Sequence, residues 1–492
     1  MAWYHLLYNV KPGAAAKPPL AVDLDGTLIR GDLFLESMLR FGFARPWQLP
    51  LLLVWLMRGR AHAKRRLAEQ FPVTAADLPY DERILAWLGE ERAQGRTIVL
   101  ATASDSRAAA AVAEHLGLFD QVFASDGRVN LKAARKAERL AEAFPAGFSY
   151  AGNESADLKV WRAASQAVVV NASDSVVRRA EAVCALEATF ERRGGALRAF
   201  VKAIRPQQWA KNLLVFVPML VGQGWSDPGA WGQALIAFWA LSLTASSVYL
   251  INDAADIDAD RRHPRKKSRP FASGALSPAI GLAAALVLLG GGLALGAASG
   301  ALLLLLVYLG ATTLYTFWLK RIVLVDVFVL SALYTIRVIL GGLATGYLAS
   351  DWLLAFSSFF FLGLALVKRA VEVDGLHARG GGEIGRRGYF STDGMILKMM
   401  GVAAGFVAAL VLALYIQAPE NQAHYHEPFL LWALPGAVVF WTCRLWLMAD
   451  RGEMHDDPLI FAFRDKTSLA LALLTAIAFA AAVLAPPNFL PW

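Results

Sequence analysis

Long apolar segments fill the second half of the chain, and they constrain its fold more than any other feature of the sequence. A helix needs about 20 apolar residues to cross a bilayer, and its backbone polar groups must be satisfied internally. The segments therefore predict an all-α polytopic membrane domain. We predict about nine transmembrane helices, near residues 212–224, 230–251, 277–298, 301–318, 322–346, 352–371, 395–417, 428–448 and 467–486.

The loops between these spans alternate in charge. Nearly all Lys and Arg residues of this half lie in the loops at 253–276, 319–321, 368–394 and 449–466, and the loops near 225, 299, 348 and 420 contain almost none. Lys and Arg are enriched in cytoplasmic loops. We therefore expect a multi-pass protein of a bacterial-type inner membrane, with the basic loops and the N-terminal domain in the cytoplasm.

The charge and the cysteine content narrow the range of partners. The net charge is +8, and the basic residues of the second half collect in short loops. This pattern favours an anionic membrane surface or phosphorylated substrates over nucleic acid. The two cysteines, Cys184 and Cys443, lie far apart and lack metal-ligand spacing. We therefore expect no structural disulfide.

The first 200 residues alternate short apolar strands with helical patterns, which predicts a doubly wound α/β sheet. The predicted strand at 20–22 ends at Asp23 and Asp25. One carboxylate at this position can attack phosphorus, and the other can pass a proton to the leaving oxygen. The strands at 97–101 and 148–152 also end in polar residues. Because such sheets bind ligands at the C-terminal ends of their strands, we predict a phosphate-handling site there.

These stretches, in this order, resemble the haloacid-dehalogenase-like hydrolases. The resemblance implies that Asp23 is the nucleophile and that Asp25 is the acid/base. It also implies that the hydroxyl of Thr102 binds phosphate. Lys136 best matches the family's lysine, and Lys132 is the alternative.

The same resemblance implies a Mg²⁺ site that includes Asp23 and Asp157. The other acidic metal position of the family is occupied here by Asn153, with Glu154 beside it. Because a neutral amide is a weaker ligand for Mg²⁺ than a carboxylate, two interpretations remain open. The domain is either an active phosphatase or a retained but catalytically silent fold.

The domain boundaries follow from these patterns. We predict a leader at 1–17, a hydrolase domain at 18–185 with a helical cap at about 31–90, a linker helix at 186–203, and a membrane domain at 204–490. Within the cap, residues 46–57 are apolar but too short to span a bilayer, and basic residues flank them. This segment is either a helix on the membrane surface or a buried cap helix.

Acidic residues are concentrated where the second span ends. On a helix, the spacing of Asp253, Asp256 and Asp260 would turn all three carboxylates the same way, and Asn252 adds a neutral oxygen. Carboxylates at this density repel one another unless a cation joins them. Clustered oxygen ligands suit Mg²⁺, which binds substrate phosphates at the same time. The alternative is a solvated loop at the membrane edge.

Two other groups of charged residues lie where a substrate can reach them. Lys368, Arg369 and Glu372 are at the cytoplasmic end of the sixth span. Arg337 lies inside the fifth span, where an arginine is costly and indicates a partner in the protein interior. We favour a ligand phosphate as that partner. The alternative is an ion pair with Asp326, although eleven residues of helix separate the two by about 16 Å.

Residues 200–490 resemble the UbiA superfamily of intramembrane prenyltransferases, whose first Asp-rich motif matches residues 252–260. Lys368 and Arg369 stand where an aromatic-acceptor member has a second Asp-rich motif. Basic side chains disfavour a second Mg²⁺ there and favour phosphate. More specifically, residues 205–212, 252–270, 334–342 and 368–372 look like those of the decaprenyl-phosphate phosphoribosyltransferase branch.

This resemblance implies a donor, an acceptor and a set of ligands. The donor is phosphoribosyl pyrophosphate, and the acceptor is a polyprenyl phosphate. The residues of the Asp-rich motif would bind the pyrophosphate through Mg²⁺, whereas Lys211, Lys368 and Arg369, with Arg337 as a helper, would bind phosphates. The fused hydrolase domain would then remove the 5-phosphate of the product. The alternative function is transfer of a prenyl group from a prenyl diphosphate to an aromatic acceptor.

Overall fold

The computed structural model describes residues 17–192, 194–377, 388–454 and 457–486, and these form two compact units. The first unit holds the described residues up to Ala203 together with Ile251–Ala283. The second holds Ile204–Leu250 and the described residues from Ala284 onward. The Asp-rich segment therefore folds with the N-terminal domain. The predicted leader lies outside the described residues, apart from Lys17.

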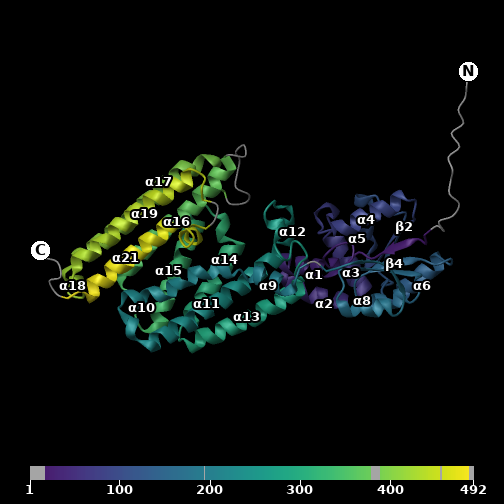
Figure 1. Cartoon of the computed structure of the whole chain (residues 1–492), viewed down its shortest axis with the longest axis horizontal. Helices are drawn as coiled ribbons and strands as arrows, with labels where there is room; N and C mark the ends of the chain where they lie inside the picture. Colours follow the sequence, from purple (N-terminus) through teal and green to yellow (C-terminus); the bar gives the residue numbers. More distant parts are fainter. Residues whose placement is uncertain (1–16, 193, 378–387, 455–456, 487–492) are drawn as a thin grey trace, which may run out of the picture. The chain divides into compact units, whose positions relative to one another are not determined.

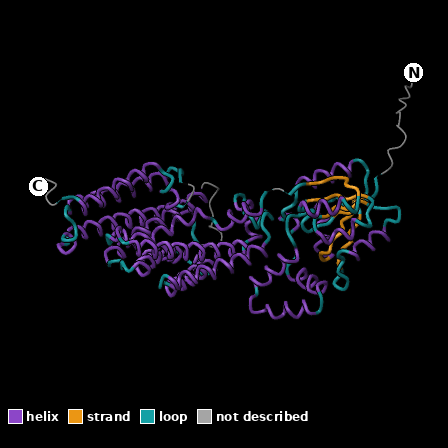
Figure 2. Tube along the Cα trace, turned by 60° about the horizontal axis from the view of Figure 1, so that its bottom comes forward, coloured by secondary structure: helices purple, strands orange, loops and turns teal. Residues whose placement is uncertain are grey.

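A parallel sheet forms the centre of the first unit (Figure 2). Its six strands in the described part of the chain are β1 (Leu20–Val22), β2 (Ile98–Asp105), β3 (Gln121–Ser125), β4 (Ser149–Gly152), β5 (Gln166–Val170) and β6 (Ala185–Phe190). Their order is β3-β2-β1-β4-β5-β6. The order reverses at β1, where open sheets of this kind bind ligands. Strand β6 pairs with β5 inside the segment that we predicted as the start of the linker.

Helices cover both faces of the sheet, which confirms the doubly wound prediction (Figure 1). Successive side chains of a strand point to opposite faces. Leu20 and Val22 therefore pack with α4 (Glu82–Ala93) and α5 (Ser106–Leu116). Ala21 belongs to the core of the opposite face, which is formed with α6 (Ala134–Ala143), α7 (Leu158–Trp161) and α8 (Asp174–Glu181).

Three helices between β1 and β2 form the cap. They are α1 (Leu33–Ala44), α2 (Leu49–Met57) and α3 (Arg60–Gln70), and they share a small core of their own that includes Phe41, Leu52 and Trp55. Helix α2 contributes only part of its surface to this core. Several of its other apolar side chains are exposed.

Seven described helices are long and apolar enough to cross a membrane. They are α11 (Pro228–Ala255), α13 (Pro278–Ala298), α15 (Val325–Thr345), α16 (Asp351–His377), α17 (Gly394–Gln417), α19 (Ala433–Asp450) and α21 (Lys466–Leu484). Helix α14 (Leu302–Phe317) is apolar but shorter. The first predicted span is instead the 3-10 helix η4 (Pro206–Phe216) followed by the short α10 (Val217–Val221). The predicted total of nine spans is therefore not confirmed.

Short elements complete the described chain. The short α-helices are α9 (Ala196–Ile204), α12 (Ile257–Arg262), α18 (Pro419–Gln422) and α20 (Pro458–Ala462). Single 3-10 turns are η1 (Pro46–Gln48), η2 (Ala75–Asp77), η3 (Ser155–Asp157), η5 (Gly224–Ser226), η6 (Lys266–Ser268), η7 (Leu319–Arg321), η8 (Ser391–Asp393) and η9 (Pro428–Trp432). Helix α12 and turn η6 belong to the Asp-rich segment, in which α11 ends at Ala255 and α12 begins at Ile257.

A buried arginine ties strands and helices of the first unit together. The guanidinium of Arg96 contacts Glu91 at 2.8 Å and Glu187 at 2.6 Å, and it donates to the carbonyl of Pro18 at 2.9 Å. Its side chain is almost fully buried. Lys17 also contacts Glu91, at 2.6 Å, so loss of Arg96 would leave one cation for two carboxylates in a low-dielectric environment.

We predict that Arg96→Met destabilises the first unit by about 3 kcal/mol, because Lys17 still pairs with Glu91 but Glu187 loses its close cation. The midpoint of thermal unfolding of the purified protein in detergent measures the effect. Arg139→Met, which removes an exposed pair with Glu142, is the control and should change the midpoint little. Equal midpoints for the two variants would contradict the prediction.

Candidate active sites

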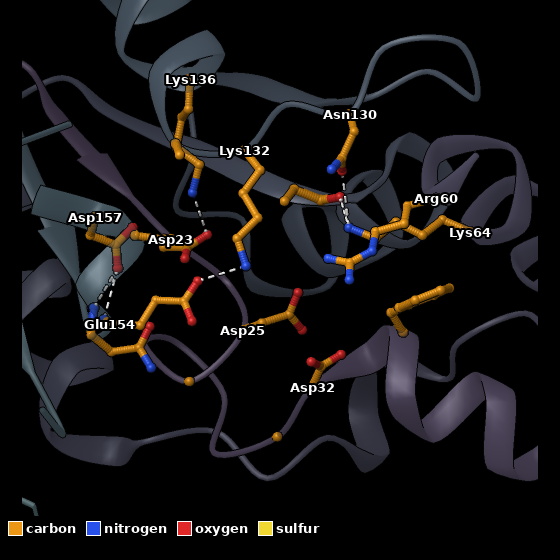
Figure 3. Close-up of a pocket in the computed structure, with 17 residues that line it drawn as sticks. Asp23, Asp25, Asp32, Arg60, Lys64, Asn130, Lys132, Lys136, Glu154 and Asp157 are labelled. Atoms are coloured by element: carbon orange, nitrogen blue, oxygen red, sulfur yellow. Dashed lines mark hydrogen bonds and ion pairs between the residues drawn. The ribbon is translucent and has the colours of Figure 1, made fainter. Parts of the chain in front are cut away.

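A cavity of about 230 Å³ lies at the C-terminal ends of β1, β2 and β4. Figure 3 shows the side chains that surround it. The acidic lining residues are Asp23, Asp25, Asp32, Glu154 and Asp157, and the basic ones are Arg60, Lys64, Lys132 and Lys136. The cavity is thus at the edge of the sheet where the sequence predicted a phosphate-handling site.

Asp23 is held by the lysine that the sequence favoured. The ammonium of Lys136 donates to Asp23 Oδ1 at 2.9 Å and to the hydroxyl of Tyr150 at 2.8 Å. Burial raises the pKa of Asp23 to about 6, and the positive charge of Lys136 opposes this rise. The alternative, Lys132, is paired with Glu154 at 2.9 Å instead. Asp23 therefore has a single cationic partner at the bottom of the cavity.

Asp25 is fixed by two donors. Its Oδ1 accepts from the backbone N–H of Leu33 at 2.9 Å, and its Oδ2 accepts from the Ser104 hydroxyl at 2.6 Å. Burial raises the pKa of Asp25 to about 7, and the negative charge of Asp32 adds to the rise. A carboxyl group that is partly protonated near neutral pH suits a group that gives a proton to a leaving oxygen.

Thr102 lies outside the cavity, whereas Asp157 lines it. Thr102 is fully buried, accepts from the backbone N–H of Ser104 at 3.0 Å, and does not line the cavity. Asp157 accepts from the hydroxyl of Tyr150 at 2.8 Å and from the backbone N–H groups of Asn153 and Glu154. Both residues thus stabilise the turns that carry the cavity side chains.

The oxygen atoms here suit Mg²⁺ only in part. In the described chain, no three His, Cys, Asp or Glu side chains are grouped so as to hold a metal ion. Asp23 supplies one carboxylate, and Asn153 supplies an amide oxygen that accepts from the Thr27 hydroxyl at 3.3 Å. The Asn153 amide also lies directly over Gly26, where an added Cβ would come within 2.1 Å. Asn153 is therefore next to Asp23–Thr27 in space, but it lacks the charge of an acidic ligand.

Two cavity residues were missed as functional by sequence reasoning. Arg60 and Lys64 begin α3, and we had interpreted them only as the basic flank of a membrane-surface segment. Lys64 donates to the Ala103 carbonyl at 2.5 Å and to Asn130 Oδ1 at 3.2 Å. Figure 3 shows both basic side chains on the opposite side of the cavity from Glu154 and Asp157. Both residues belong to the predicted cap, which covers the C-terminal ends of the strands, and this position could have identified them as cavity residues.

In the Asp-rich segment, one arginine joins two of the three aspartates. Nη1 of Arg269 lies 3.1 Å from Asp253 Oδ1 and 2.7 Å from Asp260 Oδ2. Both carboxylates are buried and converge on the same cationic atom, so one cation contacts both. Asp256 is exposed at the break between α11 and α12, so the expectation of three carboxylates on one uninterrupted helix is wrong. Asn252 is half-buried next to Asp253.

Helix α12 is held by the cap of the hydrolase domain. The guanidinium of Arg261 forms two 2.8 Å hydrogen bonds with the carboxylate of Glu36, and both side chains are buried. One turn further along α1, Arg40 contacts Asp258 at 2.6 Å. The first residue of α1, Leu33, donates to Asp25. One helix therefore contacts both the hydrolase acid/base and the Asp-rich segment.

A second charged cluster lies within the membrane unit. Lys211, on η4, contacts Asp457 at 2.6 Å, and Lys368, on α16, lies 3.8 Å from the same carboxylate. The hydroxyl of Tyr334 donates to Asp457 at 3.3 Å. The sequence predicted both lysines as phosphate ligands but did not identify Asp457, which precedes a proline in a loop that we had treated only as basic.

Arg337 is buried within α15 and has neutral partners. It donates to Asn212 Oδ1 and to the Tyr308 hydroxyl, each at 3.0 Å, and also to the Leu333 carbonyl. No carboxylate pairs with it in the part of the chain that the structure describes. Gly341 lets η4 approach α15, because an added Cβ would lie 2.0 Å from the Val215 carbonyl oxygen.

Arg369 is fully buried and is paired within the protein. It forms ion pairs with Asp326 and Glu372, and the Tyr389 hydroxyl donates to Asp326 at 2.6 Å. The alternative that paired Arg337 with Asp326 is therefore wrong, because Arg369 occupies that carboxylate. Of the residues predicted at the end of the sixth span, only Lys368 joins the Asp457 cluster.

Comparisons with known proteins match a different family to each half of the chain. The UbiA prenyltransferase family matches residues 214–382, and a haloacid dehalogenase-like hydrolase family matches residues 20–162. The uncharacterized protein y4nM of Sinorhizobium fredii is 38% identical over 95% of this chain and 91% of its own length. A decaprenyl-phosphate phosphoribosyltransferase of Mycobacterium tuberculosis is 33% identical over 58% of this chain and 93% of its own. A solved UbiA homologue from Archaeoglobus fulgidus, bound to GPP and Mg²⁺, aligns with 57% of this chain and 98% of its own at 14% identity and a TM-score of 0.45.

We predict that Asn153→Asp lowers the Mg²⁺ concentration that half-saturates phosphate-ester hydrolysis, by about tenfold, because a carboxylate replaces an amide next to Asp23. Hydrolysis of p-nitrophenyl phosphate during a Mg²⁺ titration provides the measurement. The new carboxylate can still accept from Thr27, so the turn should be retained. Glu154→Gln is the control, since it also changes one charge at the cavity, and an equal change in both variants would contradict a specific role for position 153.

Proposed function

Because the chain belongs to the UbiA prenyltransferase family and carries a haloacid-dehalogenase-like hydrolase domain, we propose that it moves a phosphoribosyl group from phosphoribosyl pyrophosphate to a polyprenyl phosphate. The protein is a multi-pass integral membrane transferase. The observation that carries the proposal is the excess of positive charge in the membrane unit. Among the described residues, Lys211, Lys368 and Arg337 have one carboxylate partner, Asp457, and phosphate groups would balance the remaining charge.

Each charged group then has a part in the transfer. Asp253 and Asp260, with Asp256 and Asn252 nearby, would hold Mg²⁺ and the pyrophosphate of the donor. Bound Mg²⁺ would stabilise the charge that develops on the leaving pyrophosphate. Lys211 and Lys368 would bind phosphate groups, and Arg337 would assist. A phosphate oxygen of the lipid then forms a bond to the ribose C1 as the bond from C1 to pyrophosphate breaks.

Lys368, which lies within α16, also bears on the choice of donor. A prenyl-diphosphate transferase with an aromatic acceptor would need acidic ligands there for a second Mg²⁺. Lys368 contacts Asp457 instead, and Arg369 is buried against Asp326. This arrangement favours a phosphate ligand over a second metal ion. With the donor bound at the basic loops, both sites would face the cytoplasm, as the charge of the loops predicts.

The hydrolase domain would act on the product of this transfer. The product carries a phosphomonoester at the ribose 5-position and a phosphodiester to the lipid. Asp23 would attack the phosphorus of the monoester while Asp25 gives a proton to the ribose oxygen, and water would then release phosphate from Asp23. Two sites on one chain raise the effective concentration of the intermediate where the linkage lets them exchange it.

The basic side chains of the cap indicate what else the cavity binds. Lys136 and Lys132 each have a carboxylate partner. Lys64 has only neutral acceptors, and the guanidinium of Arg60 makes no hydrogen bond or ion pair within the described residues. Cations without a carboxylate partner at the cap end of the cavity suit a second anionic group. The phosphodiester of a lipid-linked ribose 5-phosphate is such a group.

Membranes that contain the protein test the proposed reactions directly. We predict that label from phosphoribosyl pyrophosphate enters the lipid extract only when polyprenyl phosphate and Mg²⁺ are present. Asp253→Asn should reduce transfer by about a hundredfold or more, since metal-assisted charge stabilisation contributes several kcal/mol. Asp23→Asn should leave transfer intact and accumulate the phosphorylated lipid sugar.

Asp258→Asn is the matched control for the Asp-rich segment, because Asp258 contacts Arg40 and does not join the Arg269 cluster. Its transfer activity should stay within about threefold of wild type. The proposed donor would be wrong if label entered an aromatic acceptor from prenyl diphosphate and none entered lipid from phosphoribosyl pyrophosphate. The alternative prenyl transfer would then be the function. Equal phosphate release by wild type and Asp23→Asn would exclude the hydrolase step.

We predict that Arg60→Gln and Lys64→Gln raise the KM for ribose 1,5-bisphosphate by about tenfold and change the KM for ribose 5-phosphate much less. The physical reason is that each variant loses a charge-assisted contact to the second anionic group only. Arg66→Gln, on the same helix but paired with Glu69, is the control. A parallel rise in KM for both substrates would assign these residues to the reacting phosphate instead.

A further inference from the structure

The cap carries an apolar surface that its own core leaves uncovered. Leu52 and Trp55 of α2 are buried against the cap core, whereas the other side of the helix and the preceding turn are exposed. The exposed apolar residues in this surface, which we call the α2 face, are Trp47, Leu49, Leu51, Leu53, Val54 and Met57. Trp47 is 73% exposed and Met57 is 87% exposed. Apolar side chains this concentrated and this exposed mark an interaction surface in a soluble domain.

The charges around the α2 face have one sign. Residues 37–68 contain seven Lys and Arg side chains and no Asp or Glu. These residues are Arg40, Arg45, Arg58, Arg60, Lys64, Arg65 and Arg66. Arg58, at the end of α2, is exposed, and its guanidinium has no hydrogen bond or ion pair within the described residues. An apolar helix face with basic residues at its ends matches the anionic surface of a bilayer, where side chains enter the interface and cations contact lipid phosphates.

We propose that the α2 face docks on the membrane surface and holds the mouth of the hydrolase cavity at the lipid headgroups. The partner is the lipid surface itself, chosen over a second copy of the chain because the charged side chains that flank α2, Arg45 and Arg58, are basic and have no carboxylate partner among the described residues. Two copies that paired through this face would bring like charges together, at a cost in free energy. An anionic leaflet would instead balance them.

The position of α2 in the chain connects this surface to the cavity. Only Arg58 and Gly59 separate α2 from α3, and α3 begins with Arg60, which lines the cavity. Gly59 adopts a φ of 114°, which a residue with a side chain rarely reaches, so it makes the sharp turn between the two helices. Docking of α2 would therefore place Arg60 and Lys64 near the interface. A phosphate ester that is anchored in the bilayer could then enter the cavity without leaving the membrane.

Fluorescence quenching in liposomes tests the docking and needs no enzymatic activity. The background is Cys184→Ser with Cys443→Ser, into which Leu53→Cys is introduced and labelled with an environment-sensitive dye. We expect nitroxide lipids with a shallow label to quench this dye and dissolved iodide to quench it poorly. Glu138→Cys, on exposed α6 at the other face of the sheet, is the control and should show the reverse.

Three outcomes are possible in this experiment, and each one decides the proposal. Quenching by lipid at position 53 supports it. Equal access of iodide to positions 53 and 138 overturns it, because the α2 face would then be in water. Protection from iodide without lipid quenching, together with excimer formation by pyrene at position 53, also overturns it and identifies a second copy as the partner.

A kinetic test addresses the substrate and rests on the proposed hydrolase function. Leu53→Ser with Met57→Ser removes exposed apolar surface only, so the fold should remain. We expect the KM for a lipid-linked phosphomonoester in vesicles to rise by about tenfold, with kcat unchanged and p-nitrophenyl phosphate hydrolysis unaffected. Equal KM values for the lipid substrate would overturn the link between docking and substrate capture. If neither substrate is hydrolysed by wild type, the hydrolase function fails, and the quenching result stands independently.

Discussion

Carboxylates in a low-dielectric environment need a cation, and this constraint shapes each of the charged sites in the described chain. Asp23 is next to Lys136, and Asp253 and Asp260 share Arg269. In each case a basic side chain of the same protein contacts the oxygens that a divalent cation would use. Such a pair stabilises the fold in the absence of a ligand, and under the proposed function a metal ion and phosphate would replace it when a substrate binds.

The buried ion pair between Glu36 and Arg261 also affects which segments fold together. Removing one member of a buried, doubly hydrogen-bonded pair is costly, so α12 is expected to stay with the cap. This explains why the Asp-rich segment folds in the same unit as the hydrolase domain, although it directly follows a membrane helix in the sequence. The phosphoribosyltransferase relative matches little more than half of this chain, and the match covers most of that relative. The hydrolase domain is therefore an addition that, in this chain, also supports the transferase segment.

Local patterns made much of the first unit predictable. Short apolar strands that end in polar residues identified the positions of Asp23 and Asp25, and the helix start after β3 identified Lys136. These features depend on residues close together in the sequence and on the general rule that parallel strands present their C-terminal ends together. The fold class of both halves was predictable for the same reason, since hydrophobic periodicity and span length are local properties.

Contacts between residues that are distant in the sequence were harder to predict. Asp457 contacts Lys211 although 246 residues separate them, and no local sequence pattern at either residue predicts this contact. Arg369 takes the carboxylate of Asp326, which helical geometry had already placed too far from Arg337. The break at Asp256 was also missed, because spacing alone assumes a continuous helix. In each case the competing partner is supplied by tertiary packing, which a single sequence does not reveal.

The balance of charge also suggests an order of events. Arg269 occupies the point where Asp253 and Asp260 converge, so under the proposed function the donor's pyrophosphate would have to displace it before transfer begins. The displaced guanidinium remains close by and can contact a phosphate oxygen of the donor. After transfer, departure of pyrophosphate with its cation would leave the two carboxylates uncompensated, and the return of Arg269 would restore the balance. The same arginine would thus occupy the site after each turnover, until the next donor binds.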